Sequence, residues 1–394
     1  MKILRILLVI AIAFGMMACN NEEVPQVIDG PEATVSVMVV PTSNGPSVRL
    51  TGDLSADLVA ESAIKTLEVF IFSGGLPDGY GSATAVAPAT TVSQVLEIAT
   101  HAGPKTFYVV ANADIGNTIT NEATLIALTK DLPVDTNKGL PMTSEGKTVT
   151  LVTGENQYGF KTGVTNFKEA AKQHSDTPVS LVRVNARVAI VSAKLSANLP
   201  TDQVAIFDAL TNIEVAMFNV PKTSKLFVDP LAMNADYLYG EAWPSSDTSY
   251  TVGTVNAEFK APSLSLPIVN TAAPYFYVTE NTATNAKEQM LIVLRGKPTK
   301  GGSAVVAVGL YTDVNGYTYY PVWVNALGHT YNTGHVADSK ILRNTQYNIS
   351  LTIYGIGNPT IDPVEEAFLD VNVSVEPWTV VTQDVVWGTP VVAP

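Results

Sequence analysis

The stretch ATVSVMVVPTSNGPSVRL, residues 33–50, decides how the rest of the sequence is interpreted. Val35, Val37 and Val39 share one face of an alternating pattern. Alternation with β-branched residues predicts a β-strand over Ala33–Val40. The turn-forming run TSNGPS ends that strand.

A single arginine follows this expected strand. Arg49 is the only arginine between Arg5 and Arg183. An arginine-specific protease would therefore cut once here, between Arg49 and Leu50, and separate a completed strand from the remaining chain. The alternative is an ordinary first strand followed by a solvated arginine.

The N-terminus has the features of an export signal. Lys2 and Arg5 precede an uninterrupted apolar run, Ile6–Ala18, which is too short to span a membrane. Cys19 follows at once, and the site resembles the lipobox of bacterial lipoproteins. We therefore expect a signal peptide over 1–18 and lipidation of Cys19, with a plain signal and an incidental cysteine as the alternative. The polar, acidic residues just after Cys19 resemble the surface-export signal of Bacteroidetes lipoproteins.

Composition points to an exported, acidic β-protein. The 394 residues are 46% hydrophobic and only 15% charged, and one cysteine excludes an internal disulfide. The net charge is −13, and the part after Arg49 keeps 20 basic against 32 acidic residues, or −12. Such a chain should repel nucleic acid, so we expect no nucleic-acid partner.

Short strand patterns separated by turns predict an all-β fold of two β-sandwiches. A boundary near residue 176 divides the chain into domains over 50–176 and 177–394. Helices are expected only at Asn121–Leu128, with Asn121 as N-cap, and at Phe167–His174. The expected strands after residue 50 are Ile64–Phe72, Gln94–Ile98, Thr106–Ala111, Thr148–Val152, Val179–Leu195, Ile213–Val220, Tyr275–Thr279, Met290–Arg295, Ala304–Thr312, Tyr317–Asn325, Gln346–Tyr354 and Ala367–Val375. The sequence DVNG at 313–316 predicts a hairpin between two of them.

Candidate catalytic and metal sites do not converge. His329, His335 and Asp338 could supply three ligands from one polar segment, but no fourth is evident, so no metal site is expected. No nucleophile or cofactor motif is present, and a sandwich glycosidase would need two facing carboxylates that nothing suggests. We expect no enzyme activity, no catalytic residue and no cofactor. A glycan-binding surface lipoprotein using Tyr275 or Trp323 remains an alternative.

The C-terminal end is an apolar tail. Val371, Val373 and Val375 alternate with polar residues, and Val385 and Trp387 carry the apolar character onward. An exposed apolar strand at a chain end favours aggregation unless another strand pairs with it. The alternative is that the tail folds back and seals its own domain.

Three segments, together with Cys19 and Arg49, resemble the FimA-type major fimbrillins of Bacteroidales. They are RVNARVAI at 183–190, PYFYVTEN at 274–281, and the segment 317–381, which ends in EPWTVV. Cys19 and Arg49 stand where that family has its lipidation and maturation sites. The resemblance covers nearly the whole chain and is weakest over 50–176.

The resemblance implies a pilus subunit built from two transthyretin-like β-sandwich domains. Its precursor would travel to the outer membrane as a lipoprotein. An arginine-specific protease would then remove residues 19–49, displace the strand that holds Val35, Val37 and Val39, and open a groove for a neighbour's tail strand. The implied partners are copies of the chain and other fimbrial subunits, at the cell surface. A minor tip or anchor subunit of the same pilus is the nearest alternative.

Overall fold

The structure is a computed structural model. It describes residues 30–41, 61–87, 91–131, 139–227, 237–239, 259, 264–269, 271, 273–282, 288–326, 337–361, 372–377 and 382–386. In these ranges the only helices are α3 (Glu122–Ile126) and α4 (Thr201–Ile206). The all-β fold class is therefore confirmed. No helix in the described ranges is long and apolar enough to cross a membrane.

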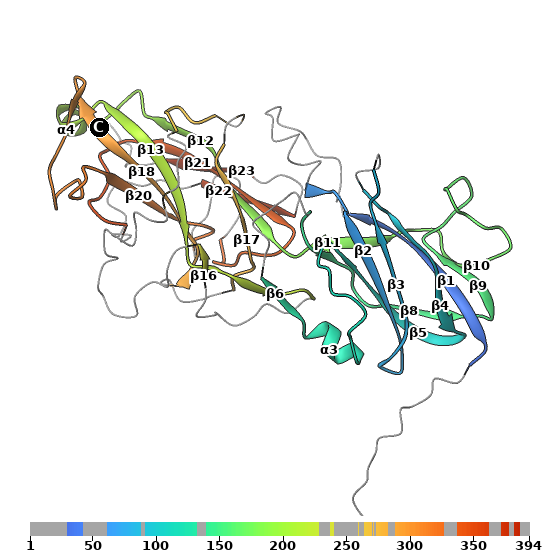
Figure 1. Ribbon diagram of the computed structural model, residues 1–394. Coiled ribbons are helices and arrows are strands. Elements are labelled where there is room, and N and C mark those ends of the chain that lie inside the picture. Colours follow the sequence, from blue (N-terminus) through green and yellow to red (C-terminus); the bar gives the residue numbers. More distant parts are fainter. Residues whose placement is uncertain are drawn as a thin grey trace, which may run out of the picture.

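The first half of the chain forms a β-sandwich around β1 (Glu32–Pro41) (Figure 1). One sheet contains β1 with β4 (Gln94–His101), β9 (Gly154–Tyr158) and β10 (Lys172–Ser175). The facing sheet contains β2 (Thr66–Ser73), β3 (Leu76–Thr84), β5 (Gly103–Ala111), β7 (Met142–Thr143) and β8 (Lys147–Leu151). Strand β11 (Val179–Arg183) pairs with β1 and with β7, and so joins the two sheets at one edge.

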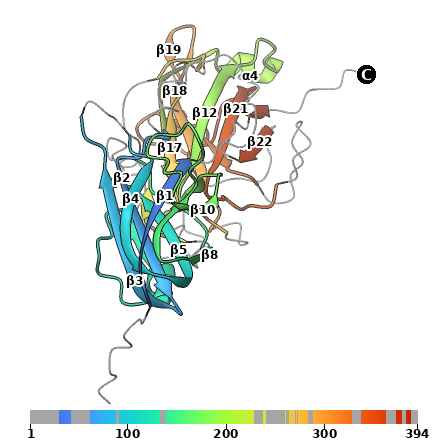
Figure 2. The same cartoon turned by 90° about the vertical axis from the view of Figure 1, so that its right-hand side faces the viewer.

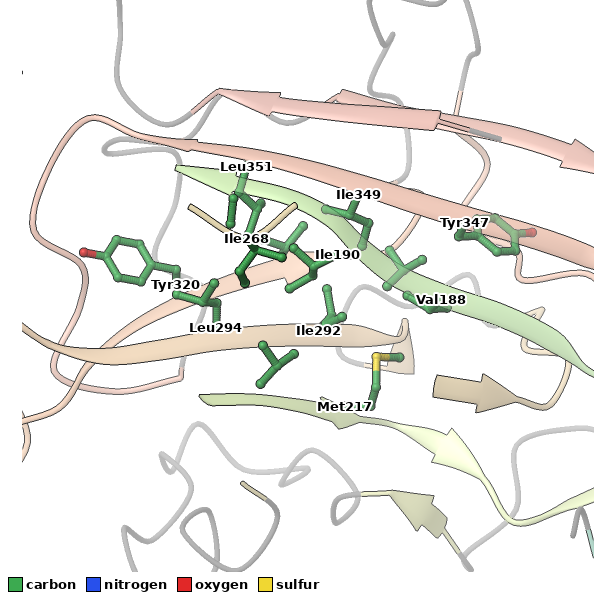
Figure 3. Packing of buried hydrophobic residues seen from close by; sticks show 14 of the residues in the cluster. Val188, Ile190, Met217, Ile268, Ile292, Leu294, Tyr320, Tyr347, Ile349 and Leu351 are labelled. Carbon is green, nitrogen blue, oxygen red and sulfur yellow. The ribbon is translucent and has the colours of Figure 1, made fainter. Parts of the chain in front are cut away.

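The second half forms another sandwich. Its first sheet contains β17 (Tyr275–Val278), β12 (Ala186–Leu195), β21 (Thr345–Ile353), β22 (Asn372–Pro377) and β23 (Thr382–Val386). The opposite sheet contains β13 (Ala209–Phe218), β18 (Leu291–Lys300), β19 (Ser303–Ala304) and β20 (Thr318–Trp323). Figure 3 shows side chains of both sheets meeting in one core, among them Ile190, Ile349, Ile292 and Met217.

The two sandwiches are joined by shared strands. β11 continues after two residues into β12, so one extended segment serves both. β15 (Thr223–Lys225) of the second half pairs with β6 (Thr129–Asp131) of the first. β14 (Val220–Pro221) and β16 (Tyr237–Tyr239) pair with each other within the second half. Phe227 packs against Tyr108 of the first sandwich with ring centroids 5.4 Å apart. The expected boundary at residues 176 and 177 precedes β11, and the domain limits stay a prediction.

Most expected strands are found, and the exceptions have physical reasons. Helix α3 is confirmed, and Asn121 caps it by accepting a hydrogen bond from the Thr124 amide. The helix expected at Phe167–His174 is wrong, because β10 at its end pairs with β9. The strand expected at Ala304–Thr312 is also wrong: only Ala304 lies in a strand, at the end of β19, and the residues that follow form a loop before β20 pairs directly with β18.

Candidate strand-exchange site

Strand β1 lies between neighbours on both of its edges. On one edge it pairs antiparallel with β4, from Glu32 opposite His101 to Met38 opposite Gln94. On the other edge it pairs in parallel, first with β9 and then, from Val39 onward, with β11. A strand paired on both edges contributes its full set of backbone hydrogen bonds to the sheet. Its removal would leave two unpaired edges facing each other.

The side chains of β1 fill the core of the first sandwich. Ala33, Val35, Val37 and Val39 are all almost completely buried, as the alternating pattern predicts. The valines pack against side chains of the facing sheet, including Val69. Each buried valine contributes about 1.5–3 kcal/mol relative to its exposed form. Loss of the strand would therefore leave an apolar groove between two unpaired strand edges.

The neighbouring strands are shaped to hold a strand in this position. A bulge between Val35 and Val37 leaves Ser36 opposite an irregular part of β4, where Glu97 has φ +53°. The Ser36 hydroxyl accepts a hydrogen bond from the Glu97 amide at 3.0 Å. Gly159 has φ +88°, and a Cβ there would lie 2.9 Å from the Met38 carbonyl oxygen. Only glycine lets the chain pass this close to β1.

A charged cluster, in which Asp78 and Lys105 are buried and His101 is partly exposed, lies where β1 begins. The Asp78 carboxylate contacts Lys105 Nζ at 2.6 Å and His101 Nδ1 at 2.6 Å, and it accepts a hydrogen bond from the Thr100 hydroxyl. Burial alone would raise the pKa of Asp78, but the hydrogen bonds from Lys105, Thr100 and His101 outweigh it and lower that pKa. His101 pairs with Glu32 in the β1–β4 ladder, so the cluster fixes the strand edge beside the start of β1.

Beyond the other end of β1, residues 42–60 lead to Glu61. The predicted cleavage residues Arg49 and Leu50 lie in this span, outside the described residues, and so does the predicted lipidation site Cys19. The structure resumes at Glu61, which is bound tightly to the second sandwich. Any cut between Pro41 and Glu61 would separate β1 from a body that stays anchored at Glu61.

Two arginines of the β11–β12 segment anchor Glu61. Arg187 Nη1 contacts the Glu61 carboxylate at 2.7 Å, with both side chains 1% exposed, and Tyr277 donates a hydrogen bond to the same oxygen. Arg183 donates to the Glu61 carbonyl oxygen and to the Ser62 hydroxyl. Burial raises the pKa of Glu61, against the opposing effect of Arg187, and burial lowers the pKa of Arg183 to about 10. Arg183 therefore stays protonated at neutral pH.

The sequence analysis did not predict that Arg183 and Arg187 bind Glu61. Arg183 and Arg187 were visible as charges in an apolar strand pattern, which signals buried ion pairs. Nothing in the pattern indicated that the carboxylate partner lies 126 residues earlier in the chain.

The tail strands pair on one edge only. β22 runs antiparallel to β21, with Tyr347 opposite Val375, and β23 then runs parallel to the same strand, with Leu351 opposite Val385. Within the described residues no other strand pairs with either of them. The tail therefore folds back on its own domain, as the alternative interpretation expected, but as an edge. The predicted donor residues Val373, Val375 and Val385 lie on these strands, whereas Val371 and Trp387 lie outside the described residues.

Two other candidate sites can be followed in the described part of the chain: the tyrosine pair of β17 and the surroundings of Asp338. Tyr277 is committed to Glu61, and Tyr275 meets it edge to face with ring centroids 5.6 Å apart, so the pair presents no flat sugar platform. Asp338 binds Asn325. His329 and His335 lie outside the described residues, and the described residues hold no group of three metal-binding side chains.

Comparisons with known proteins agree with this architecture. Residues 33–183 match the family "Major fimbrial subunit protein (FimA)", and residues 199–378 match the "FimA4 pilin C-terminal domain". The chain is 32% identical to a major fimbrium subunit FimA type-2 of Porphyromonas gingivalis, over 95% of this chain and 97% of that protein. It is 30% identical to the type-5 subunit of the same species, with the same coverage.

One solved structure with the same fold is a fimbrilin (FimA) from Porphyromonas gingivalis W83. The TM-score is 0.64 at 24% identity, and the match covers 93% of this chain and 100% of that one. At this level of identity the likeness concerns the fold, and the shared fold extends over nearly all of this chain.

Proposed function

This chain belongs to the family of FimA major fimbrial subunits, and on that premise we propose that it is a structural subunit that polymerises into cell-surface fimbriae by strand exchange. The observation that carries the proposal is the position of β1, which is buried and paired on both edges at one end of the chain. The role is structural rather than enzymatic. The fimbriae would serve adhesion and colonisation.

The precursor form would be inactive because its own strand fills the groove. In the proposed sequence of events, Cys19 carries a lipid that holds the precursor at the outer membrane. An arginine-specific protease then cuts between Arg49 and Leu50. The cut releases the lipid and the strand that contains Val35, Val37 and Val39.

An open groove would take up another strand strongly. Each buried backbone group left without a partner costs about 1–3 kcal/mol, and the exposed core adds the lost burial of the valines. A strand inserted from a neighbour restores both ladders and fills the alternating pockets, which is the physical basis of β-strand addition.

The tail strands β22 and β23 are the proposed donors. In the described structure they pair only with β21, so leaving that edge breaks one ladder, whereas insertion between β4 and β9 forms two. The contact is head to tail, since donor and acceptor lie on different sandwiches. Such a contact does not close on itself and produces a filament.

A complementation experiment tests donor and acceptor separately. A chain that ends after Asp370 lacks β22 and β23 and keeps the groove. Arg49→Ala keeps the tail and leaves the groove closed. After treatment with an arginine-specific protease, the wild-type chain 20–394 should form SDS-resistant multimers, and each variant alone should stay monomeric.

Mixing the truncated chain with the wild-type chain provides the control for the donor. Adding the cut, truncated chain to the wild-type chain should shorten the multimers in proportion to its share, because it accepts a tail but donates none. A truncated chain that forms multimers as long as those of the wild-type chain would contradict the proposed donor.

A further inference from the structure

The loop between β18 and β20 presents a dense group of exposed apolar side chains. Val306, Val308, Leu310 and Val314 are 66%, 57%, 64% and 70% exposed. Among the described residues only twelve large apolar side chains are exposed, and four of them fall within these nine positions. The segment 303–312 carries no charge, in a chain whose net charge is −13. Apolar patches on soluble proteins usually mark contact surfaces.

Hydrogen bonds within the loop hold these side chains outward. The Ala307 carbonyl oxygen accepts from the amides of Leu310, Tyr311 and Thr312, while the Thr312 hydroxyl accepts from the Ala307 amide. At the base, Asp313 is buried and its carboxylate accepts from the amides of Asn315 and Tyr317. The exposure is therefore a property of an ordered loop. We call residues 303–314 the apolar loop.

The apolar loop lies at the end of the molecule from which the tail departs. It follows the end of β18. That end lies beside α4 and the start of β13, because Ala209 pairs with Thr299 and the Asp208 amide donates a hydrogen bond to the Thr299 carbonyl oxygen. Helix α4 follows the end of β12, so β12 ends at this side of the molecule. Because β21 and β23 run parallel to β12, these two strands also end at this side. The chain that leads from β21 toward the tail starts at this same end, where the Ile356 amide donates to the Gln203 side chain of α4 at 2.9 Å.

The first residues of β1 lie at the opposite end of the molecule. Figure 2 shows β19, which begins the apolar loop, at the top and the far turns of the first sandwich at the bottom. A tail that leaves the top and enters the groove of a neighbour brings the bottom of that neighbour to the apolar loop. That surface offers an exposed apolar side chain of its own, Val152, in the turn between β8 and β9 beside Gly154, which pairs with Ala33 of β1.

We propose that the apolar loop is the second contact between successive subunits, and that it packs on the end of the first sandwich of the copy that accepts the tail. The inference rests on the proposed strand exchange and adds a surface contact to it. The uncharged segment 303–312 suits this position, because it brings no further negative charge between two cut subunits that each carry −12. Packing of this loop would fix the angle between subunits, which a single inserted strand leaves free to swivel.

Thiol labelling tests the contact. The chain 20–394 contains no cysteine, so Val306→Cys introduces a single reactive site, and Val86→Cys, which is 74% exposed on the first sandwich, is the matched control. Polymerisation should slow maleimide labelling of Val306→Cys by at least about tenfold, since interfaces exclude water from their centres. The control should label at the same rate before and after.

A second variant separates the contact from the strand insertion. Val306→Asp with Leu310→Asp should slow polymerisation of the cut chain. A synthetic peptide of residues 371–394 should still bind a cut chain that ends after Asp370 and carries both substitutions, because the groove is unchanged.

Three results would overturn the inference in distinguishable ways. Absence of multimers from the cut wild-type chain would overturn both the strand exchange and the contact. Multimers in which Val306→Cys labels at the monomer rate would overturn the contact alone. Protection of Val306→Cys in the uncut monomer, lost when the chain ends after Val386, would identify the chain's own tail as the occupant.

Discussion

At the scale of single residues, Glu61 anchors the chain that follows the cleavage site to the second sandwich, and it should still do so once β1 has left. It is buried between the sandwiches with Arg187 and Tyr277. Replacement by Gln removes the carboxylate that pairs with the buried Arg187 guanidinium. Breaking one partner of a buried pair costs about 3–5 kcal/mol, so Glu61→Gln should lower the urea midpoint of unfolding strongly.

Glu97 supplies the control for that substitution. It pairs with Lys168 at 2.7 Å on the surface. Exposed pairs contribute little, so Glu97→Gln should leave the urea midpoint nearly unchanged. Equal effects of the two substitutions would contradict the anchoring role of Glu61.

The lowered pKa of Asp78 predicts that the folded subunit loses stability at low pH. Its pKa is lowered in the folded state, so its contribution to stability is fully present above the unfolded pKa of about 3.9 and is lost as the pH falls through the folded pKa. The stability gap between the wild-type chain and Asp78→Asn should therefore be large at pH 7 and shrink as the pH falls from about 4 toward 2. Unfolding midpoints measured across that range check it, with the exposed Asp176→Asn as control. A gap that is constant with pH would rule out an ionised Asp78.

The residue level also marks the limit of prediction from sequence. The burial of Val35, Val37 and Val39 follows from alternation, because side chains of a strand point to opposite faces. The pairing of Glu61 with Arg187 does not follow, because it depends on how two sandwiches meet. The positions 42–60, with Arg49 and Leu50, lie outside the described residues, so the cleavage site stays a prediction.

At the scale of elements, β1 and β2 face each other across one core, but only β1 should leave the subunit after cleavage. Val37 of β1 and Val69 of β2 are both fully buried. Replacing either by Ala should cost the uncut subunit about 2 kcal/mol of unfolding free energy from lost apolar burial. After cleavage and polymerisation, Val37→Ala should have no effect, because its strand has gone, while Val69→Ala should still destabilise the polymer.

Chemical unfolding of uncut subunits and of washed polymers measures this difference. Persistence of the Val37→Ala effect in the polymer would mean that β1 remains in the groove.

The loop between β18 and β20 shows how an element can be mispredicted. Val306, Val308 and Leu310 alternate as in a strand, and Asp313–Gly316 is a real turn, with the Gly316 amide donating to the Asp313 carbonyl oxygen. Alternation alone does not supply a partner strand. β20 pairs with β18 along its whole length, from Leu291 opposite Trp323 to Gly296 opposite Thr318, and the apolar segment is left outside the sheet.

At the scale of the whole molecule, charge opposes assembly. The part of the chain after Arg49 carries −12, so successive subunits repel each other at low ionic strength. Raising NaCl from 20 to 200 mM shortens the Debye length from about 20 Å to about 7 Å, which should speed polymerisation of the cut chain several-fold. Light scattering after complete cleavage measures the rate, and cleavage itself should be scored separately. A rate that falls with salt would indicate that contacts between opposite charges dominate.

The central claim is that the neighbour's strand replaces β1 in the groove, and mass spectrometry of washed multimers tests it most directly. Multimers made from the chain 20–394 with an arginine-specific protease should contain subunits that begin at Leu50 and no peptide that covers residues 33–41. Multimers that retain the peptide 20–49 in equal amount with the subunits would contradict the claim, because β1 would still fill the groove.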